Sequence, residues 1–150
     1  MVDVIRDRDL GLKRIVKQFK ASPVLETLSV GVQGSSGDAD HGGITTSTLA
    51  TIHEFGAPSV NIPERAFLRG TFDRNSKKYE ALFSKAARSL ARGRRTRPMI
   101  KKIGEIAVAD VVQTINSSID LAPLKPATIA REGSSKPLLE LRDSVTWVLE

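Results

Sequence analysis

The pair His53-Glu54 is the first candidate for metal-assisted hydrolysis, because a His-Glu pair opens the zinc-binding motif of many metalloproteases. That motif needs a second histidine four residues after the first, so that both imidazoles face one metal ion from the same side of a helix. Position 57 is Ala57, and the spacing therefore fails. We interpret this segment as an ordinary short helix with a polar turn.

Three side chains near residue 40 have the chemistry to bind a divalent cation, namely Asp38, Asp40 and His41. A calcium-binding loop has ligands at alternate positions and a closing glutamate, and this segment lacks that pattern. Residues 34–43 contain four glycines together with serine and aspartate. This composition favours a flexible polar loop over a metal site.

Other catalytic motifs are incomplete. Gly31, Gly34 and Gly37 have the spacing G-x-x-G-x-x-G, but a phosphate-binding loop needs a helix directly after its glycines, and here more loop is predicted. The chain has no cysteine and two histidines, and no serine lies in a G-x-S-x-G elbow. We therefore expect a protein that is not an enzyme and that has no catalytic residue, metal or cofactor.

Basic residues are concentrated in one segment, residues 85–102, which contains no acidic residue. Its basic residues are Lys85, Arg88, Arg92, Arg94, Arg95, Arg97, Lys101 and Lys102. The net charge of the whole chain is +6, so this segment accounts for all of it. Such a cluster could contact phosphates, but a solvated helix face and a mobile loop are the simpler interpretation. It has no aromatic residue to stack on bases, which argues against specific reading of nucleic acid.

The composition indicates one soluble globular domain over residues 1–150. Hydrophobic residues make up 40% of the chain, which is enough for a core without metals or disulfides. No apolar run approaches the roughly 20 residues of a membrane-spanning helix. Residues 1–12 are charged and lack the apolar core of a signal peptide, so we expect synthesis in the cytoplasm.

The first half of the chain predicts short elements. Apolar spacing predicts a helix over residues 9–19, within an N-terminal helical segment of residues 1–22. Alternation of apolar with small or polar residues predicts a strand over residues 28–33. Residues 48–55 are predicted to form a helix that is capped by Ser47 or Thr48 and ended by Gly56. Prolines 58 and 63 then predict an extended arm that continues through residue 68.

The second half predicts two long helices, over residues 73–91 and 98–117. On the first, Tyr79, Leu82, Phe83, Ala86 and Leu90 share a face, and residues 92–97 form a basic, flexible hinge to the second. Residues 121–137 are predicted to be irregular, and residues 144–149 to form a terminal strand. The predicted fold is a single α+β domain, in which a small, mostly antiparallel sheet packs against two long helices.

Two blocks of sequence resemble a known family. Residues 49–56 read LATIHEFG and residues 61–69 read NIPERAFLR. They are similar to the signature of the tailed-bacteriophage virion morphogenesis proteins, also called tail-completion, minor tail or neck proteins. That family typically shows a helix ending in H-E-F/Y-G, a short gap and then I-P-x-R-P-F-L-R.

Later segments agree with this resemblance, which extends over residues 28–150. Residues 124–138 resemble the family pattern L-x-P-x-T-I-x-x-K-G-S-x-x-P-L, and residues 141–147 resemble its L-R-D-S-I-T strand. Three departures stand out. Ala66 occupies a position where the family often has proline, and Glu132 one where it often has lysine. The usual Thr-Gly before the last strand is missing, because Glu140 runs directly into Leu141.

The resemblance implies a structural protein of the virion, made in the host cytoplasm, that forms a ring at the head–tail junction around the DNA channel. Its expected partners are further copies of itself in a hexamer, the neighbouring neck and tail proteins, and DNA through loose contact; no membrane is expected. A tail-terminator ring that caps the tail tube is one alternative. A DNA-binding factor outside the virion, acting through residues 85–102, is another.

The resemblance and the charge pattern together name two sets of candidate site residues. The architectural or subunit-interface set is His53, Glu54, Phe55, Gly56, Pro63, Arg65, Phe67, Leu68, Arg69 and Trp147. The basic set, which we expect to face DNA or a protein partner, is Arg88, Arg92, Arg94, Arg95 and Arg97.

Overall fold

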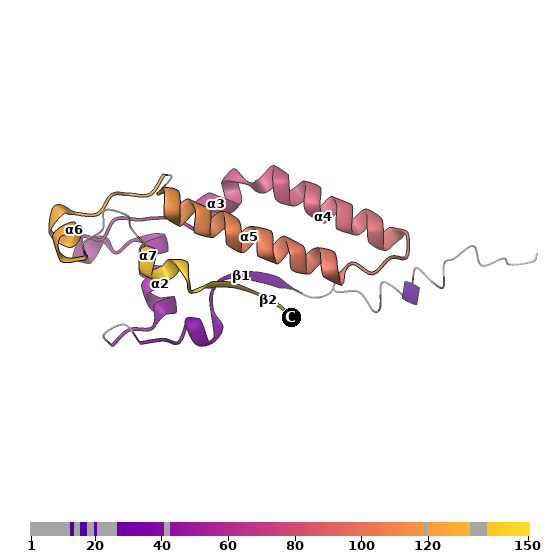
Figure 1. Ribbon diagram of the computed structural model, residues 1–150, viewed down its shortest axis with the longest axis horizontal. Helices are drawn as coiled ribbons and strands as arrows, with labels where there is room; N and C mark the ends of the chain where they lie inside the picture. The colour runs from indigo at the N-terminus through magenta and orange to yellow at the C-terminus, as the bar shows by residue number, and fades with distance from the viewer. Residues whose placement is uncertain are drawn as a thin grey trace, which may run out of the picture.

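The computed structural model describes Lys13, Val16, Lys17, Lys20 and residues 27–40, 43–118, 120–132 and 138–150. The helix predicted over residues 9–19 lies almost wholly outside the described residues. In chain order, the elements are β1 (Leu28–Val32), α2 (Thr46–Phe55), α3 (Arg69–Arg74), α4 (Ser76–Ala91), α5 (Arg97–Ser117), α6 (Pro126–Glu132), α7 (Leu139–Arg142) and β2 (Val145–Leu149) (Figure 1). Two 3-10 turns, η2 (Gly34–Ser36) and η3 (Pro58–Val60), lie in the connections. The predicted α+β fold class is confirmed.

Strands β1 and β2 form a two-stranded antiparallel sheet, which confirms both strand predictions. The apolar residues of the two strands lie opposite one another: Val30 pairs with Trp147, Leu28 with Leu149 and Val32 with Val145. Directly opposite residues share a face of a sheet, so all the alternating apolar residues lie on one side. That side packs on α5, where a Cβ added to Gly104 would lie 2.8 Å from the Trp147 ring. The glycine therefore permits the close approach of helix and sheet.

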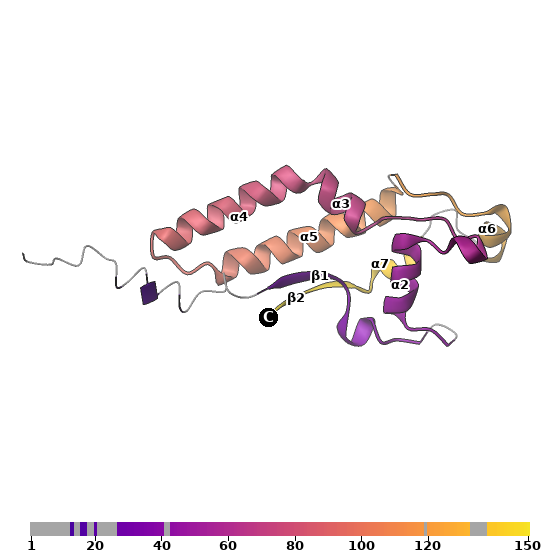
Figure 2. The ribbon, with the colours of Figure 1, turned by 180° about the vertical axis from the view of Figure 1, so that it is seen from behind.

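Helix α5 lies between the sheet and α4, as both views show (Figures 1 and 2). One core cluster contains Phe67, Val111 and Leu141 and extends to the sheet, and a second joins α4 to α5 through Ala86 and Ile103. The sheet packs mainly on α5, and α4 covers the other side of that helix.

The helix predicted over residues 73–91 is divided at Asn75. Backbone dihedrals of φ −101° and ψ 10° at this residue end α3 and precede α4, and its Nδ2 donates to the Thr71 carbonyl at 2.9 Å. Phe83, which was predicted to share the apolar face of this helix, is 44% exposed. The buried stripe of α4 is centred on Tyr79, Ala86 and Leu90, and Phe83 lies at its margin.

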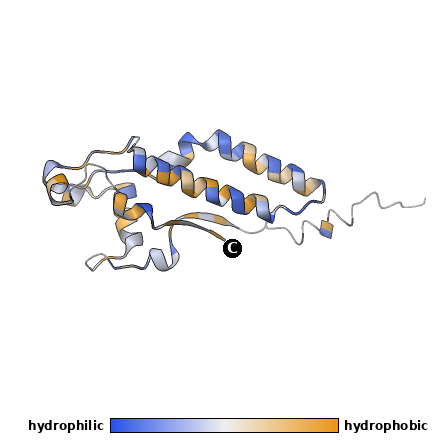
Figure 3. Ribbon diagram, in the orientation of Figure 1, coloured by the Kyte–Doolittle hydropathy of each residue, from blue (hydrophilic) through white to orange (hydrophobic). Residues whose placement is uncertain are grey.

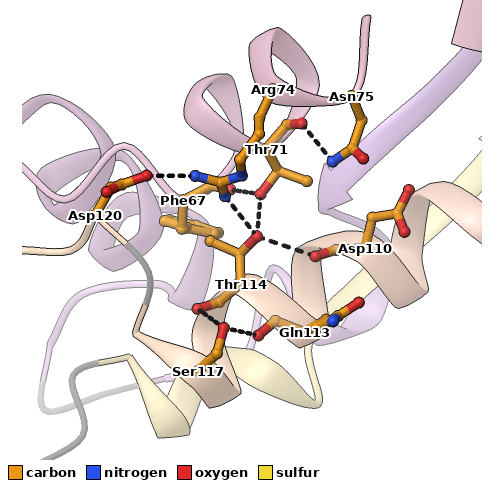
Figure 4. A network of polar contacts seen from close by, with 9 residues as sticks. All are labelled: Phe67, Thr71, Arg74, Asn75, Asp110, Gln113, Thr114, Ser117 and Asp120. Atoms are coloured by element: carbon orange, nitrogen blue, oxygen red, sulfur yellow. Dashed lines mark hydrogen bonds and ion pairs between the residues drawn. The ribbon is translucent and has the colours of Figure 1, made fainter. Parts of the chain in front are cut away.

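A polar network joins α3 to α5 (Figure 4). The Thr71 hydroxyl donates to Thr114 Oγ1 at 2.7 Å. The Thr114 hydroxyl in turn donates to the Asp110 carbonyl oxygen at 3.1 Å. Arg74 also donates to Thr114 Oγ1, at 3.0 Å, and its other terminal nitrogen lies 2.7 Å from the Asp120 carboxylate. Thr71 and Thr114 are buried, and a buried hydroxyl without a hydrogen bond would lower the stability of the fold. These bonds satisfy both hydroxyls.

Three local predictions need correction. Helix α2 begins at Thr46 with Thr45 as its cap, so Ser47 and Thr48 lie inside the helix. The Thr45 hydroxyl oxygen accepts from the Thr48 N–H at 3.2 Å. The predicted extended arm starts instead with η3, and α6 lies within the segment predicted to be irregular. Pro126 begins α6, where the absent N–H of proline costs no helical bond.

Candidate functional site

The first two blocks of the family resemblance, residues 49–56 and 61–69, meet where α2 and α3 face each other, and we call this region the α2–α3 junction. Glu54, in the last turn of α2, is 6% exposed. Its Oε2 accepts the Leu68 N–H and its Oε1 accepts the Arg69 N–H, each at 2.9 Å. These are the first amides of α3, whose own cap residue makes no side-chain bond. Glu54 therefore supplies the missing cap from another helix, with its negative charge at the positive end of α3.

Arg65 is the second buried charged residue of the junction and is 4% exposed. Its Nε donates to the Ala122 carbonyl at 2.8 Å and its Nη2 to the Pro123 carbonyl at 3.2 Å. Its Nη1 lies 3.2 Å from Nδ1 of His53. The planar guanidinium thus ties the connection after α5 to the end of α2, which a single-point donor such as lysine could not do.

Gly56 allows the chain to turn back toward α2. Its backbone has φ 72° and ψ 169°, a region that is open in practice to glycine alone. A Cβ at this position would lie 2.8 Å from the Glu64 backbone nitrogen. The turn brings the Arg65 N–H to the His53 carbonyl, at 2.8 Å. The glycine that was predicted to end the helix therefore also sets the distance between the two parts of the motif.

Two apolar side chains of the junction are exposed, with charged residues nearby. Phe55 is 62% exposed and Val60 is 65% exposed, and the Arg69 guanidinium lies 5.4 Å from the centre of the Phe55 ring. Arg69 also pairs with Glu64. Pro63 is exposed. Val60 was not predicted from the sequence, because a single valine beside proline and serine gives no periodic signal.

The remaining candidates of the architectural set pack against the chain's own core. Phe67 is fully buried in the main core, and Leu68 packs against that core. Trp147 lies away from the junction, on the sheet, where it packs against Gly104 of α5 in its own chain. Most of the set thus maintains the fold, and Phe55 is the member with a largely exposed apolar side chain.

The basic set gathers at the opposite end of the α4–α5 hairpin, which we call the hairpin tip (residues 85–102). Arg88 and Arg92 lie at the end of α4, Arg94 and Arg95 lie in the turn, and Arg97 begins α5. Figure 3 shows hydrophilic residues along this turn. Gly93 and Thr96 are buried, and Gly93 has φ 68°. The predicted flexibility of residues 92–97 and 34–43 remains a prediction.

The loop considered as a metal site has an architectural contact. Asp40 Oδ1 accepts the Gly43 N–H at 3.0 Å, which closes a local turn. His41 lies outside the described residues. Within the part of the chain that is described, no group of three or more histidine, cysteine, aspartate and glutamate side chains could hold a metal ion.

Tyr79 was missed as part of a polar cluster, because it was assigned to the core. Its hydroxyl donates to Asp110 Oδ2 at 2.7 Å, and Lys78 Nζ lies 2.7 Å from both carboxylate oxygens. Burial raises the pKa of Tyr79 well above its usual value, and the hydrogen bond and the negative charge of Asp110 raise it further. This tyrosine is therefore a fixed hydrogen-bond donor at neutral pH.

No helix among the described residues is long and apolar enough to cross a membrane. Comparisons with known proteins find no match of this chain to a protein-family model, to a curated protein or to a solved structure.

Proposed function

We propose that this chain is a structural component of a tailed-bacteriophage virion, of the tail-completion or neck class, and acts through protein contacts rather than by catalysis. In this proposal it forms a ring, a hexamer, around the DNA channel at the head–tail junction and binds the neighbouring neck and tail proteins. The observation that supports the proposal best is the interlocking of H-E-F-G with I-P-E-R-A-F-L-R at the α2–α3 junction.

The interlocking supports an architectural role for the motif, because its charged groups are occupied by the chain itself. The Glu54 carboxylate accepts two main-chain amides, and the Arg65 guanidinium donates to two main-chain carbonyls. Neither is exposed enough to bind a substrate. What the junction presents to the outside is Phe55 and Val60, the kind of apolar side chain that a protein partner buries.

The sheet offers a second contact surface. In the described residues, β1 and β2 pair with each other and with no third strand, so each has an edge whose N–H and C=O groups are unpaired within the sheet. Such an edge can accept a strand from a neighbouring chain. A contact between unlike surfaces of successive copies closes into a ring when the rotation permits.

The direct test is a reconstruction of the assembled phage particle. We expect density for this chain as a closed ring on the tail axis at the neck. A ring at the end of the tail tube would instead favour the tail-terminator alternative. Isolated copies away from the axis, or absence of the chain from purified particles, would contradict the proposal. Absence combined with duplex binding in solution would favour the DNA-binding alternative.

A pair of matched variants tests the contact surface. Phe55→Ser is expected to leave the fold intact, since the ring is mostly exposed, and to reduce the yield of complete particles. Phe83→Ser removes a partly exposed phenylalanine from α4 and serves as the control. Equal particle yields from the two variants would argue against the α2–α3 junction as the assembly surface.

A further inference from the structure

We infer that the hairpin tip binds the phosphodiester backbone of duplex nucleic acid, without regard to base sequence. The inference concerns a second surface, at the other end of the α4–α5 hairpin from α3. It does not depend on ring formation or on a place in the virion. Its failure and the failure of the proposed function would therefore be seen separately.

The fold concentrates positive charge at this one place. The end of α4, the turn and the start of α5 bring basic residues that are distributed over residues 85–102 to one end of the hairpin. The turn is held by the chain itself, since the Gly93 N–H donates to the Leu90 carbonyl at 2.7 Å and the Arg94 N–H to the Ser89 carbonyl at 3.1 Å. These bonds also satisfy carbonyls at the negative end of α4.

Most of this charge has no acidic partner in the part of the chain that the structure describes. Among the described residues, the side chains of Lys85, Arg88, Arg92, Arg94, Arg95 and Lys101 form no ion pair with an acidic group. Lys102 pairs with Glu105, three residues later on the same helix. The first turn of α5 contains no acidic residue, so the positive end of that helix dipole adds to the field of the tip. A polyanion would relieve this repulsion between like charges.

Phosphate fits the tip better than the other common polyanionic partners. Arginine predominates over lysine here, and its planar fork can donate two parallel bonds to one phosphate. A protein interface needs a dehydrated apolar centre, and a membrane-surface helix needs large apolar side chains beside its charges. The exposed uncharged residues of the tip are small, such as Ala87, Ala91 and Pro98.

The same composition indicates binding without sequence recognition. Contacts to phosphate fix a protein on a duplex but carry no direct sequence information. Residues 85–102 contain no aromatic residue to stack on bases and no asparagine or glutamine to recognise adenine. The expected signature is therefore affinity that falls steeply with salt concentration and is the same for different sequences.

The test uses the full chain and measures binding to fluorescent 30-base-pair DNA and RNA duplexes by anisotropy across a salt series. The triple variant Arg92→Gln, Arg94→Gln and Arg95→Gln removes three charges from the tip. The control Lys77→Gln, Lys125→Gln and Arg142→Gln removes three charges elsewhere. A third variant replaces the three tip arginines by lysine, which keeps the charge. Circular dichroism melting of every variant monitors the fold.

We expect the glutamine tip variant to reduce the slope of log K against log salt by about 2 to 3, and the control to reduce it by less than about 1. The lysine variant should keep the slope of the wild type. Preference for DNA over RNA duplex would identify the source of the backbone. Equal losses in tip and control variants, or equal binding to polyglutamate or to anionic phospholipid vesicles, would overturn the inference.

Discussion

Arginine has opposite roles at the two ends of this molecule. At the α2–α3 junction, Arg65 is buried and donates to two main-chain carbonyls. At the hairpin tip, Arg94 and Arg95 are exposed and have no internal acidic partner among the described residues. The two regions use the same residue type, but of these three arginines only Arg65 has hydrogen-bond acceptors from the described part of its own chain beside its guanidinium. An arginine whose donors are used inside the chain builds the fold, whereas one whose donors are unused is available to a partner.

The largest expected loss of stability comes from Arg65→Met, a substitution of the buried arginine at the α2–α3 junction. Methionine keeps much of the side-chain volume but leaves the Ala122 and Pro123 carbonyls without their donor. We expect the free energy of unfolding to fall by about 3 kcal/mol, as for other buried charged groups that lose their bonds. Urea denaturation measures this. Arg95→Met at the tip is the control and should change stability by less than about 0.5 kcal/mol. Equal changes would show that the two arginines are not distinguished by burial.

Two matched glycine substitutions are expected to give the next largest loss in the free energy of unfolding. Gly56→Ala combines a glycine-only backbone conformation with a Cβ placed 2.8 Å from the Glu64 backbone nitrogen. We expect a loss of about 2 to 3 kcal/mol. Gly93→Ala, at φ 68°, should cost about 1 to 2 kcal/mol, the usual penalty for an alanine in the left-handed region. Thermal melting compares them, and a smaller loss for Gly56→Ala would argue against tight contact at the junction.

Glu54→Gln tests the cap that α2 provides for α3. The amide keeps one oxygen acceptor but turns a donor toward the second main-chain N–H, and it removes the charge at the helix end. A loss of about 1.5 kcal/mol is expected. Hydrogen exchange should speed up most at the Leu68 and Arg69 amides, while exchange at the tip stays as in the wild type. Unchanged exchange at these two amides would contradict the capping role.

The smallest expected effect is a change in melting temperature at alkaline pH, caused by the ionisation of Tyr79. The pKa of Tyr79 is raised in the folded state, so its hydrogen bond contributes fully below the ordinary tyrosine pKa of about 10. The contribution is lost as pH rises above that value. Between about pH 9 and 11, the melting temperature of the wild type should therefore fall more than that of Tyr79→Phe. If the melting temperatures of the two proteins fall in parallel with pH, the stabilising role of the Tyr79 hydrogen bond would be contradicted.

The sequence predicted the elements whose signal is periodic. Strand alternation gave both strands, and the long apolar stripe gave α5 nearly to the residue, because burial on one face is itself periodic. The break at Asn75 was missed because it depends on a side-chain bond to the Thr71 carbonyl. The true cap of α2 was missed because Thr45 stands in a run of serine and threonine in which any member could cap.

The candidate site was predicted as a list of residues and not as an arrangement. The resemblance identified Glu54 and Arg65, but it could not give their partners. Those partners are main-chain atoms, which every residue has, and the carbonyls that accept from Arg65 lie far along the chain, at Ala122 and Pro123. The hairpin tip was easier to predict, since its basic residues are neighbours in sequence.

The pairing of β1 with β2 has a consequence for the order of folding. The two strands close a loop that runs from Val32 to Val145, whereas α4 and α5 are joined by a short turn. Local contacts form sooner because they close smaller loops, so we expect the hairpin to form early and the sheet to form late. Until the sheet closes, β1 can accept β2 from a second copy as readily as its own. At high concentration the same strand pairing would then give domain-swapped dimers on refolding.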